Sequence, residues 1–124
     1  MPNADVARLF VYGSLKRGFS NEHQMKGATF LRTCATQSGF RLVRYLGGYP
    51  ALVAVPGDAG HVDGELYDVE ELLLAALDEF EGCPQVYQRN QILMNEGSWA
   101  AAYLVSPTQA RGFPLLEGSV WREA

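Results

Sequence analysis

The sequence has 124 residues, of which 48% are hydrophobic and 19% are charged. This composition excludes a disordered polar chain, and the length predicts a single domain over residues 1–124. Ten Lys and Arg residues against fourteen Asp and Glu residues give a formal net charge of −4. We therefore expect no nucleic-acid partner, because such a partner requires a basic surface.

No apolar run approaches the roughly 20 residues that would span a bilayer. The N-terminus also lacks the basic and hydrophobic regions of a secretion signal, so we expect no membrane partner and a cytoplasmic location. The two cysteines, Cys34 and Cys83, are expected to be free thiols. With only two histidines in the chain, the chemistry is expected to use carboxylates, hydroxyls and backbone dipoles. The sequence makes no prediction of the oligomeric state.

The N-terminal half of the sequence is predicted to be rich in β-structure. The run Leu9–Tyr12 is a compact apolar segment that ends at a glycine, which is typical of a buried strand. Residues 13–18 form a glycine-bounded loop. Residues 21–26 are expected to form a short helix that Gly27 ends. Residues 28–55 are predicted to contain further strands, separated by Gly and Pro residues.

The second half combines one helix with further strands. The alternation that begins at residue 61 places four side chains on one face of a strand: His61, Asp63, Glu65 and Tyr67. Asp68 is expected to cap a helix that ends before Gly82, with Glu71 completing a capping box. Residues 85–94 and 99–105 are predicted to be two more strands. The sequence thus predicts an α+β fold with about six strands and one main helix.

In this helix, a rotation of about 100° per residue groups four apolar side chains into one buried stripe: Leu73, Ala76, Leu77 and Phe80. Asp78 and Glu79 are expected to point toward solvent, whereas Glu81 falls at the border of the stripe. In the last turn the helix dipole disfavours a charged carboxyl, and partial burial acts in the same direction. Glu81 is therefore a candidate general base. The alternative is a glutamate that only hydrogen-bonds a neighbour.

The loop after the first strand is a candidate anion site. The spacing of Gly13 and Gly18 is similar to that of a phosphate-binding loop, but Phe19 stands where that motif requires lysine. Nucleotide hydrolysis is therefore unsupported. A strand that ends in Tyr12–Leu15 presents successive backbone N–H groups, which can bind a carboxylate. The alternative is an ordinary tight turn.

Other side chains are weaker candidates. Tyr87 and Arg89 alternate along a predicted strand and share a face. Arg89 is expected to pair with a carboxylate, either from a substrate or from Glu81. Glu65 is a second candidate acid. A metal site built from the histidine and carboxylates of the same strand is disfavoured, because they come from neighbouring positions of one strand. We therefore predict no metal and no cofactor.

Several motifs together resemble the γ-glutamylcyclotransferase-like superfamily. Residues 10–18 (FVYGSLKRG) are similar to its opening signature, and residues 64–67 (GELY) to its central strand. Residues 77–84 (LDEFEGCP), followed by 87–89 (YQR), resemble the γ-glutamylamine cyclotransferase branch in particular. The pair Gly118 and Trp121 is similar to a closing motif of small bacterial members.

The resemblance implies a small mixed β-barrel with flanking helices. It also implies a metal-free enzyme that releases 5-oxoproline and a free amine from a γ-glutamyl-amine, a small-molecule substrate. Under this resemblance Glu81 is the catalytic acid/base. Backbone N–H groups of the loop receive the α-carboxylate of the substrate, and two further residues line the pocket. The implied substrate-binding residues are Tyr12, Gly13, Ser14, Leu15, Tyr87 and Arg89.

Two other functions remain open at this point. The same loop would serve a non-catalytic module that binds a small carboxylate such as a γ-glutamyl metabolite. A hydrolase that uses Glu81 to activate water would release free glutamate instead of 5-oxoproline. The identity of the leaving amine is also open: a polyamine, the ε-amine of lysine and an aminoglycoside precursor are all compatible with the motifs.

Overall fold

The computed structural model describes residues 6–123. In this part of the chain seven strands form one mixed sheet: β1 (Val6–Val11), β2 (Thr29–Ala35), β3 (Phe40–Arg44), β4 (Pro50–Ala54), β5 (Asp63–Glu70), β6 (Gln88–Leu93) and β7 (Trp99–Val105). The helical segments are α1 (Glu71–Phe80), α2 (Pro107–Ala110) and the 3₁₀ turns η1 (Glu22–Met25) and η2 (Leu46–Gly48). None of the described helices is long and apolar enough to cross a membrane.

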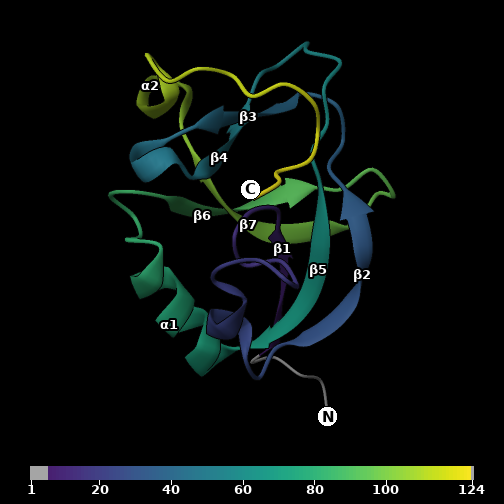
Figure 1. Ribbon diagram of the computed structural model, residues 1–124. Coiled ribbons are helices and arrows are strands. Elements are labelled where there is room, and N and C mark those ends of the chain that lie inside the picture. Colours follow the sequence, from purple (N-terminus) through teal and green to yellow (C-terminus); the bar gives the residue numbers. More distant parts are fainter. Residues whose placement is uncertain (1–5, 124) are drawn as a thin grey trace.

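The strand order is β2-β5-β1-β7-β4-β3, and β6 pairs with the other edge of β7. Strands β1 and β4 therefore follow one another along the same edge of β7, and both run parallel to it. Phe10 pairs with Ala102, and Leu52 pairs with Leu104. The sheet forks at this place, because β1 leaves the β7 edge where β4 begins. Figure 1 shows β1 near the centre of the molecule and α1 beside it.

The sheet curves into a barrel-like shape. A bridge between Thr36 and Met94 joins the end of β2 to the end of β6. One interior cluster receives buried side chains from strands throughout the sheet, among them Phe10, Leu42, Leu52, Leu66, Ile92 and Ala102. Burial of this apolar surface drives the curvature, because a flat sheet would leave the cluster in water. The α+β barrel predicted from the sequence is confirmed.

Successive side chains of β1 point to opposite faces of the strand, and each face contributes to a different hydrophobic core. Phe10 points into the barrel, whereas Leu9 and Val11 face α1. The outer core also contains Leu74 and Leu77 of α1. Helix α1 is thus held against the outside of the barrel by apolar packing.

The C-terminal tail runs back across the barrel, drawn in yellow in Figure 1. The N–H of Leu116 donates to the carbonyl of Leu42 (2.8 Å), and the N–H of Asp63 donates to the carbonyl of Ser119 (2.8 Å). Trp121 is 9% exposed and joins the interior cluster. The tail therefore links β3 to the start of β5.

Several expectations for the elements are confirmed. The strand predicted at 99–105 has the same bounds in the structure, and segment 28–55 contains β2, β3 and β4. The short α2 was not predicted, although Ser106 and Gln109 form a capping box there and Pro107 opens the helix. That signal was present in the sequence.

The predicted start of the main helix is wrong. Asp68 lies within β5, where its backbone pairs with Arg8 on one side and Thr29 on the other. Glu70 is the N-cap of α1, and its side chain makes no capping hydrogen bond. Strand pairing on both edges of β5 outweighs the local capping preference of Asp68.

The predicted buried stripe of α1 is also partly wrong. Leu74 and Leu77 are buried, whereas Ala76 and Phe80 are exposed. The buried face is rotated from the predicted stripe toward Leu74, and Asp78 is half-buried rather than in solvent. Because of this rotation, Glu81 lies on the centre line of the buried face instead of at its border.

Close approach of β5 to β1 requires a glycine at position 64. A Cβ atom there would collide with the carbonyl oxygen of Val11 and lie 2.8 Å from the ring of Phe10. We expect Gly64→Ala to lower the free energy of unfolding by roughly 3 kcal/mol. Urea unfolding would measure this loss. Gly57→Ala is the control, because it adds a Cβ in open space at φ +85° and should cost only about 1 kcal/mol. Equal costs for the two variants would contradict the packing argument.

Candidate active site

A cavity of about 360 Å³ opens where the sheet forks. Its walls come from the end of β1 and the loop after it, the segment from η2 to the start of β4, the end of α1 with the segment that follows it, and strand β7. The volume is in the range of small-molecule sites. Four of the residues singled out in the sequence as one loop, Tyr12 to Leu15, line this cavity together with Glu81 and Tyr87.

The loop presents a row of backbone donors. The N–H of Lys16 donates to the carbonyl of Gly13 (3.1 Å), which closes a tight turn. Within residues 6–123, the N–H groups of Gly13, Ser14 and Leu15 donate to no protein acceptor. Successive backbone donors of this kind can bind an anion. The arrangement suits a carboxylate that enters the cavity.

Two contacts shape the cavity side of this loop. A Cβ on Gly13 would lie 2.9 Å from Cγ of Pro50, so only glycine allows the loop to pack on the start of β4. The amide of Asn21 donates to Oγ of Ser14 (2.8 Å), and the N–H of Asn21 donates to the carbonyl of Ser14 (2.9 Å). Asn21 therefore holds Ser14 in place.

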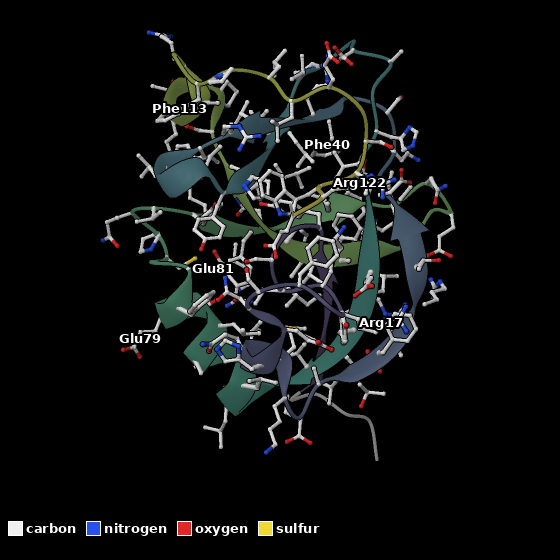
Figure 2. All side chains as sticks on the ribbon, viewed as in Figure 1. Arg17, Phe40, Glu79, Glu81, Phe113 and Arg122 are labelled. Carbon is white, nitrogen blue, oxygen red and sulfur yellow. The ribbon has the colours of Figure 1, made fainter. Side chains whose placement is uncertain are left out.

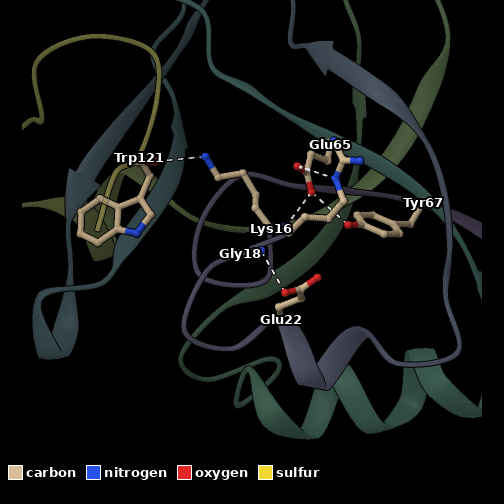
Figure 3. Close-up of polar contacts among 7 residues, drawn as sticks. Lys16, Gly18, Glu22, Glu65, Tyr67 and Trp121 are labelled. Atoms are coloured by element: carbon tan, nitrogen blue, oxygen red, sulfur yellow. Dashed lines mark hydrogen bonds and ion pairs between the residues drawn. The ribbon is translucent and has the colours of Figure 1, made fainter. Parts of the chain in front are cut away.

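Glu65 fastens the far side of the loop, as Figure 3 shows. Its carboxylate accepts from the N–H of Arg17 (3.0 Å), from Nε of Arg17 (3.3 Å) and from the hydroxyl of Tyr67 (2.9 Å). The second candidate acid of the sequence thus has three donors of its own, and it does not line the cavity.

Lys16 ties the same loop to the C-terminal tail. Its Nζ is hydrogen-bonded to the carbonyl of Trp121 (3.0 Å) and lies 4.4 Å from the centre of the Phe19 ring. Burial lowers the pKa of Lys16, and the nearby Glu65 charge opposes this. Ser20 adds a further tie, because its N–H and its hydroxyl both donate to Glu123 (2.8 Å each).

Tyr12 spans the fork in the sheet. Its hydroxyl donates to the carbonyl of Tyr103 on β7 (2.5 Å) and accepts from the N–H of Leu52 on β4 (3.1 Å). Burial raises the pKa of this phenol well above its usual value. The hydroxyl of Tyr12 therefore holds β1, β4 and β7 together.

Helix α1 ends in a motif that directs Glu81 into the cavity. The N–H of Gly82 donates to the carbonyl of Glu79 (3.0 Å), and the N–H of Cys83 donates to the carbonyl of Asp78 (2.9 Å). These two bonds, with Gly82 at φ +66°, form a Schellman cap. Figure 2 shows Glu81 directed toward the centre of the molecule and Glu79 directed away from it.

The carboxyl of Glu81 is half-buried, and within residues 6–123 it has no hydrogen bond or ion pair. Burial raises its pKa from 4.5 to about 7. The charged form of Glu81 also helps to raise the pKa of Tyr12 and Tyr87. A half-buried carboxyl that titrates near neutrality in a cavity is a candidate for proton transfer.

The two pocket-wall candidates of the sequence have different positions. Tyr87 lines the cavity, and its hydroxyl donates to the carbonyl of Pro50 (2.9 Å). Arg89 does not line it. It forms a two-pronged ion pair with Asp78, with Nε–Oδ1 at 2.9 Å and Nη2–Oδ2 at 3.1 Å. Glu81 is not its partner.

Asp78 also accepts from the hydroxyl of Tyr103 (2.7 Å). Tyr103 lies on β7 and lines the cavity, so this pair joins the end of α1 to the sheet. Sequence reasoning did not find this role for Asp78, nor the contribution of Asn21 and Tyr103 to the site. Asp78 shares the buried face of α1 with Leu74 and Leu77, and a correct helical phase would have found it.

The side chains of His61, Asp63 and Glu65, which the sequence analysis considered as metal ligands, do not converge on one point. Nε2 of His61 lies 3.5 Å from Oδ1 of Asp63, whereas Glu65 is directed to Arg17 and Tyr67. In the described part of the chain, no group of three or more His, Cys, Asp or Glu side chains is arranged to hold a metal ion.

Comparison with known proteins adds an independent observation. A family model described as "Gamma-glutamyl cyclotransferase, AIG2-like" matches residues 9–123. The chain belongs to this family. The match covers the loop after β1, the end of α1 and the C-terminal tail, which are the parts of the chain that build and support the cavity.

Named relatives agree with this assignment. The gamma-glutamylaminecyclotransferase of Rattus norvegicus is 39% identical over 103 residues, which cover 78% of this chain and 69% of the relative. The Homo sapiens protein of the same name is 34% identical over 119 residues, or 87% of this chain and 76% of the relative. The crystal structure of an AIG2-like protein from Mus musculus has a TM-score of 0.78 at 32% identity, covering 90% of this chain and 86% of that chain. The family resemblance seen in the sequence motifs is confirmed.

The raised pKa of Glu81 in this family member predicts a pH-dependent stability cost. Between pH 4.5 and about 7 the folded state holds a proton that the unfolded state has lost, so stability falls as the pH rises. Glu81→Gln removes this loss, because glutamine stays neutral. We expect the variant to match the wild type near pH 4.5 and to exceed it at pH 8 by on the order of 3 kcal/mol. Urea unfolding across this pH range would measure the difference.

Glu79→Gln is the matched control, because Glu79 lies two residues away on the exposed face of the same helix. It should show the same pH dependence as the wild type. A Glu81→Gln variant that gains no stability above pH 7 would contradict the burial of this charge.

Proposed function

We propose that this protein is a γ-glutamylamine cyclotransferase. It would release 5-oxoproline and a free amine from a γ-glutamyl-amine. The observation that carries the proposal is the half-buried Glu81 carboxyl, which has no hydrogen-bond or ion-pair partner among residues 6–123. It shares one cavity with the backbone donors of the loop after β1. Family membership over residues 9–123 adds to it.

The loop holds the fixed end of the substrate in this proposal. The α-carboxylate binds the N–H groups of Gly13, Ser14 and Leu15, and these donors cost little to organise because Asn21 and Pro50 already shape the loop. Tyr12 and Tyr87 line the wall of the site. Arg89 acts indirectly, because its ion pair with Asp78 supports the last turn of α1.

The reaction is an intramolecular acyl transfer. The Glu81 carboxylate removes a proton from the α-ammonium group of the substrate. The freed nitrogen attacks the γ-carbonyl carbon and closes a five-membered ring. Glu81 then returns this proton to the leaving nitrogen, and the original C–N bond breaks. The ring nitrogen gives up its second proton by way of Glu81 to the departing amine, which leaves as an ammonium ion. Charge and atoms balance with no added reactant.

Such a reaction asks little of the protein beyond position and proton transfer. The nucleophile and the carbonyl belong to one molecule, so holding the reactive conformer supplies much of the rate enhancement. We therefore propose that neither a metal nor a cofactor takes part. A pKa of about 7 suits Glu81 to both steps, because the group then gives and takes protons with similar ease near neutral pH.

The first test of the reaction is substitution of the proposed acid/base. We expect Glu81→Gln to lower the turnover of γ-glutamyl-ε-lysine or γ-glutamyl-putrescine about 10²-fold or more, with binding largely kept. Release of 5-oxoproline, followed by mass spectrometry, measures the turnover. Glu79→Gln should retain wild-type activity. Full activity in the Glu81→Gln variant would remove Glu81 from the mechanism.

The same assay separates the alternatives. Free glutamate in place of 5-oxoproline would indicate hydrolysis. Saturable binding of both compounds without any product would indicate a carboxylate-binding module on the same fold.

The second test is the pH dependence of the wild type. A general base must be deprotonated, so kcat/KM should fall about tenfold for each pH unit below the pKa of Glu81, which is about 7. Initial rates between pH 5 and pH 8 would show this limb. A flat profile across the interval would contradict base catalysis by a group with this pKa.

A further inference from the structure

The outer part of the cavity is apolar, in contrast to its inner part. Eight large hydrophobic side chains of the described chain are exposed, and four of these line the cavity: Leu46, Tyr49, Phe80 and Val86, between 37% and 51% exposed. We call these four residues the apolar collar. Tyr12, Leu15 and Tyr103, also in the cavity wall, are at most 6% exposed. The cavity therefore runs from a buried end with backbone donors to an apolar mouth.

The collar adjoins the proposed acid/base. Phe80 directly precedes Glu81, and Val86 packs on Gly82, where an added Cβ would lie 2.8 Å from Cγ2 of Val86. On the opposite wall, Leu46 and Tyr49 flank the two glycines of η2. A group expelled past Glu81 toward the mouth would leave between these side chains.

The cavity wall provides few groups that could stabilise a charge on the leaving amine. Among its described lining residues, Glu81 is the one that carries a formal charge at neutral pH. The nearby cations are already engaged outside the lining. Nη1 of Arg44 donates to the carbonyl of Gly48 (3.3 Å), Lys16 bonds Trp121, and Arg89 pairs with Asp78. The four collar residues themselves carry no charge, so a carboxylate or ammonium that packs against them loses part of its hydration without gaining an ion pair from the collar, which is costly.

From this contrast we infer that the leaving amine carries an uncharged, apolar substituent, an alkyl or aromatic group that packs against Leu46, Tyr49, Phe80 and Val86. This inference rests on the proposed function and narrows its substrate class. It favours amines with a hydrocarbon chain over the three amines that the sequence motifs leave open, which are a polyamine, the ε-amine of lysine and an aminoglycoside precursor.

The test compares three γ-glutamyl amides of nearly equal length. γ-Glutamyl-n-pentylamide ends in a methyl group, γ-glutamyl-putrescine ends in an ammonium group, and γ-glutamyl-4-aminobutyrate ends in a carboxylate. We expect kcat/KM for the pentylamide to exceed the other two by about tenfold or more. Equal or higher values for either charged amide would overturn the inference.

A charge placed in the collar tests its location. Leu46→Asp should move the ratio of kcat/KM between the putrescine and pentyl amides about tenfold toward putrescine. Leu72→Asp is the matched control, because Leu72 is 87% exposed on α1 and does not line the cavity. It should leave the ratio unchanged. An equal shift in both variants, or none in Leu46→Asp, would overturn the position of the subsite.

A binding measurement separates this inference from the proposed reaction. Calorimetry on the Glu81→Gln variant gives Kd for the three amides without turnover, and the pentylamide should bind about tenfold or more tightly than the charged pair. If no amide yields 5-oxoproline with the wild type, the proposed function fails, while the order of the Kd values still decides the subsite. Absence of binding by all three would overturn both.

Discussion

The fork in the sheet is the constraint on which the site depends. Strands β1 and β4 share one edge of β7. The pairing of β1 with this edge must therefore stop after Phe10, so that β4 can pair with it from Leu52 onward. In a continuous sheet the backbone donors of the next residues would pair with a neighbouring strand. Here the residues after β1 turn away from the sheet instead. The hydroxyl of Tyr12 bridges the gap in strand pairing with hydrogen bonds to β7 and to β4. A break in pairing thus produces free donors and a cavity at the same place, as it does at the switch points of open α/β sheets.

The remaining contacts stiffen what the fork exposes. Behind the loop, the carboxylate of Glu65 collects three donors and Lys16 reaches the tail. The carboxyl groups around the candidate site are of two kinds. Glu65 and Asp78 are satisfied by several partners, which costs little in stability. Glu81 has none in the described structure, and its burial opposes folding above pH 4.5. Such a cost is typical of a group kept for chemistry rather than for stability.

Local patterns in the sequence predicted the strands and the two halves of the candidate site, and the family resemblance of contiguous motifs implied the barrel. The sequence did not predict the rotation of α1. Leu72, Leu73 and Leu74 are adjacent, so their spacing alone is compatible with more than one buried face. Only packing on β1 and β5 selects Leu74 and Leu77. Asp68 was misplaced because pairing on both edges of β5 is a long-range effect. The partner of Arg89 and the collar residues come from distant segments, and no local pattern brings those segments together.

The Schellman cap of α1 has a consequence for how this chain can vary. Because the cap fixes the last turn, the direction of Glu81 is set by the number of residues between the buried Leu77 and Gly82. One residue added or removed there would rotate the carboxylate by about 100°, out of the cavity, while the helix itself stayed intact. The number of residues in this last turn is therefore more constrained than the identity of the residues on the exposed face of the helix. The exposed positions Ala75, Ala76 and Glu79 are open to substitution. An insertion in this turn, of a size that a surface loop would tolerate, would leave a folded barrel in which the Glu81 carboxyl points into solvent.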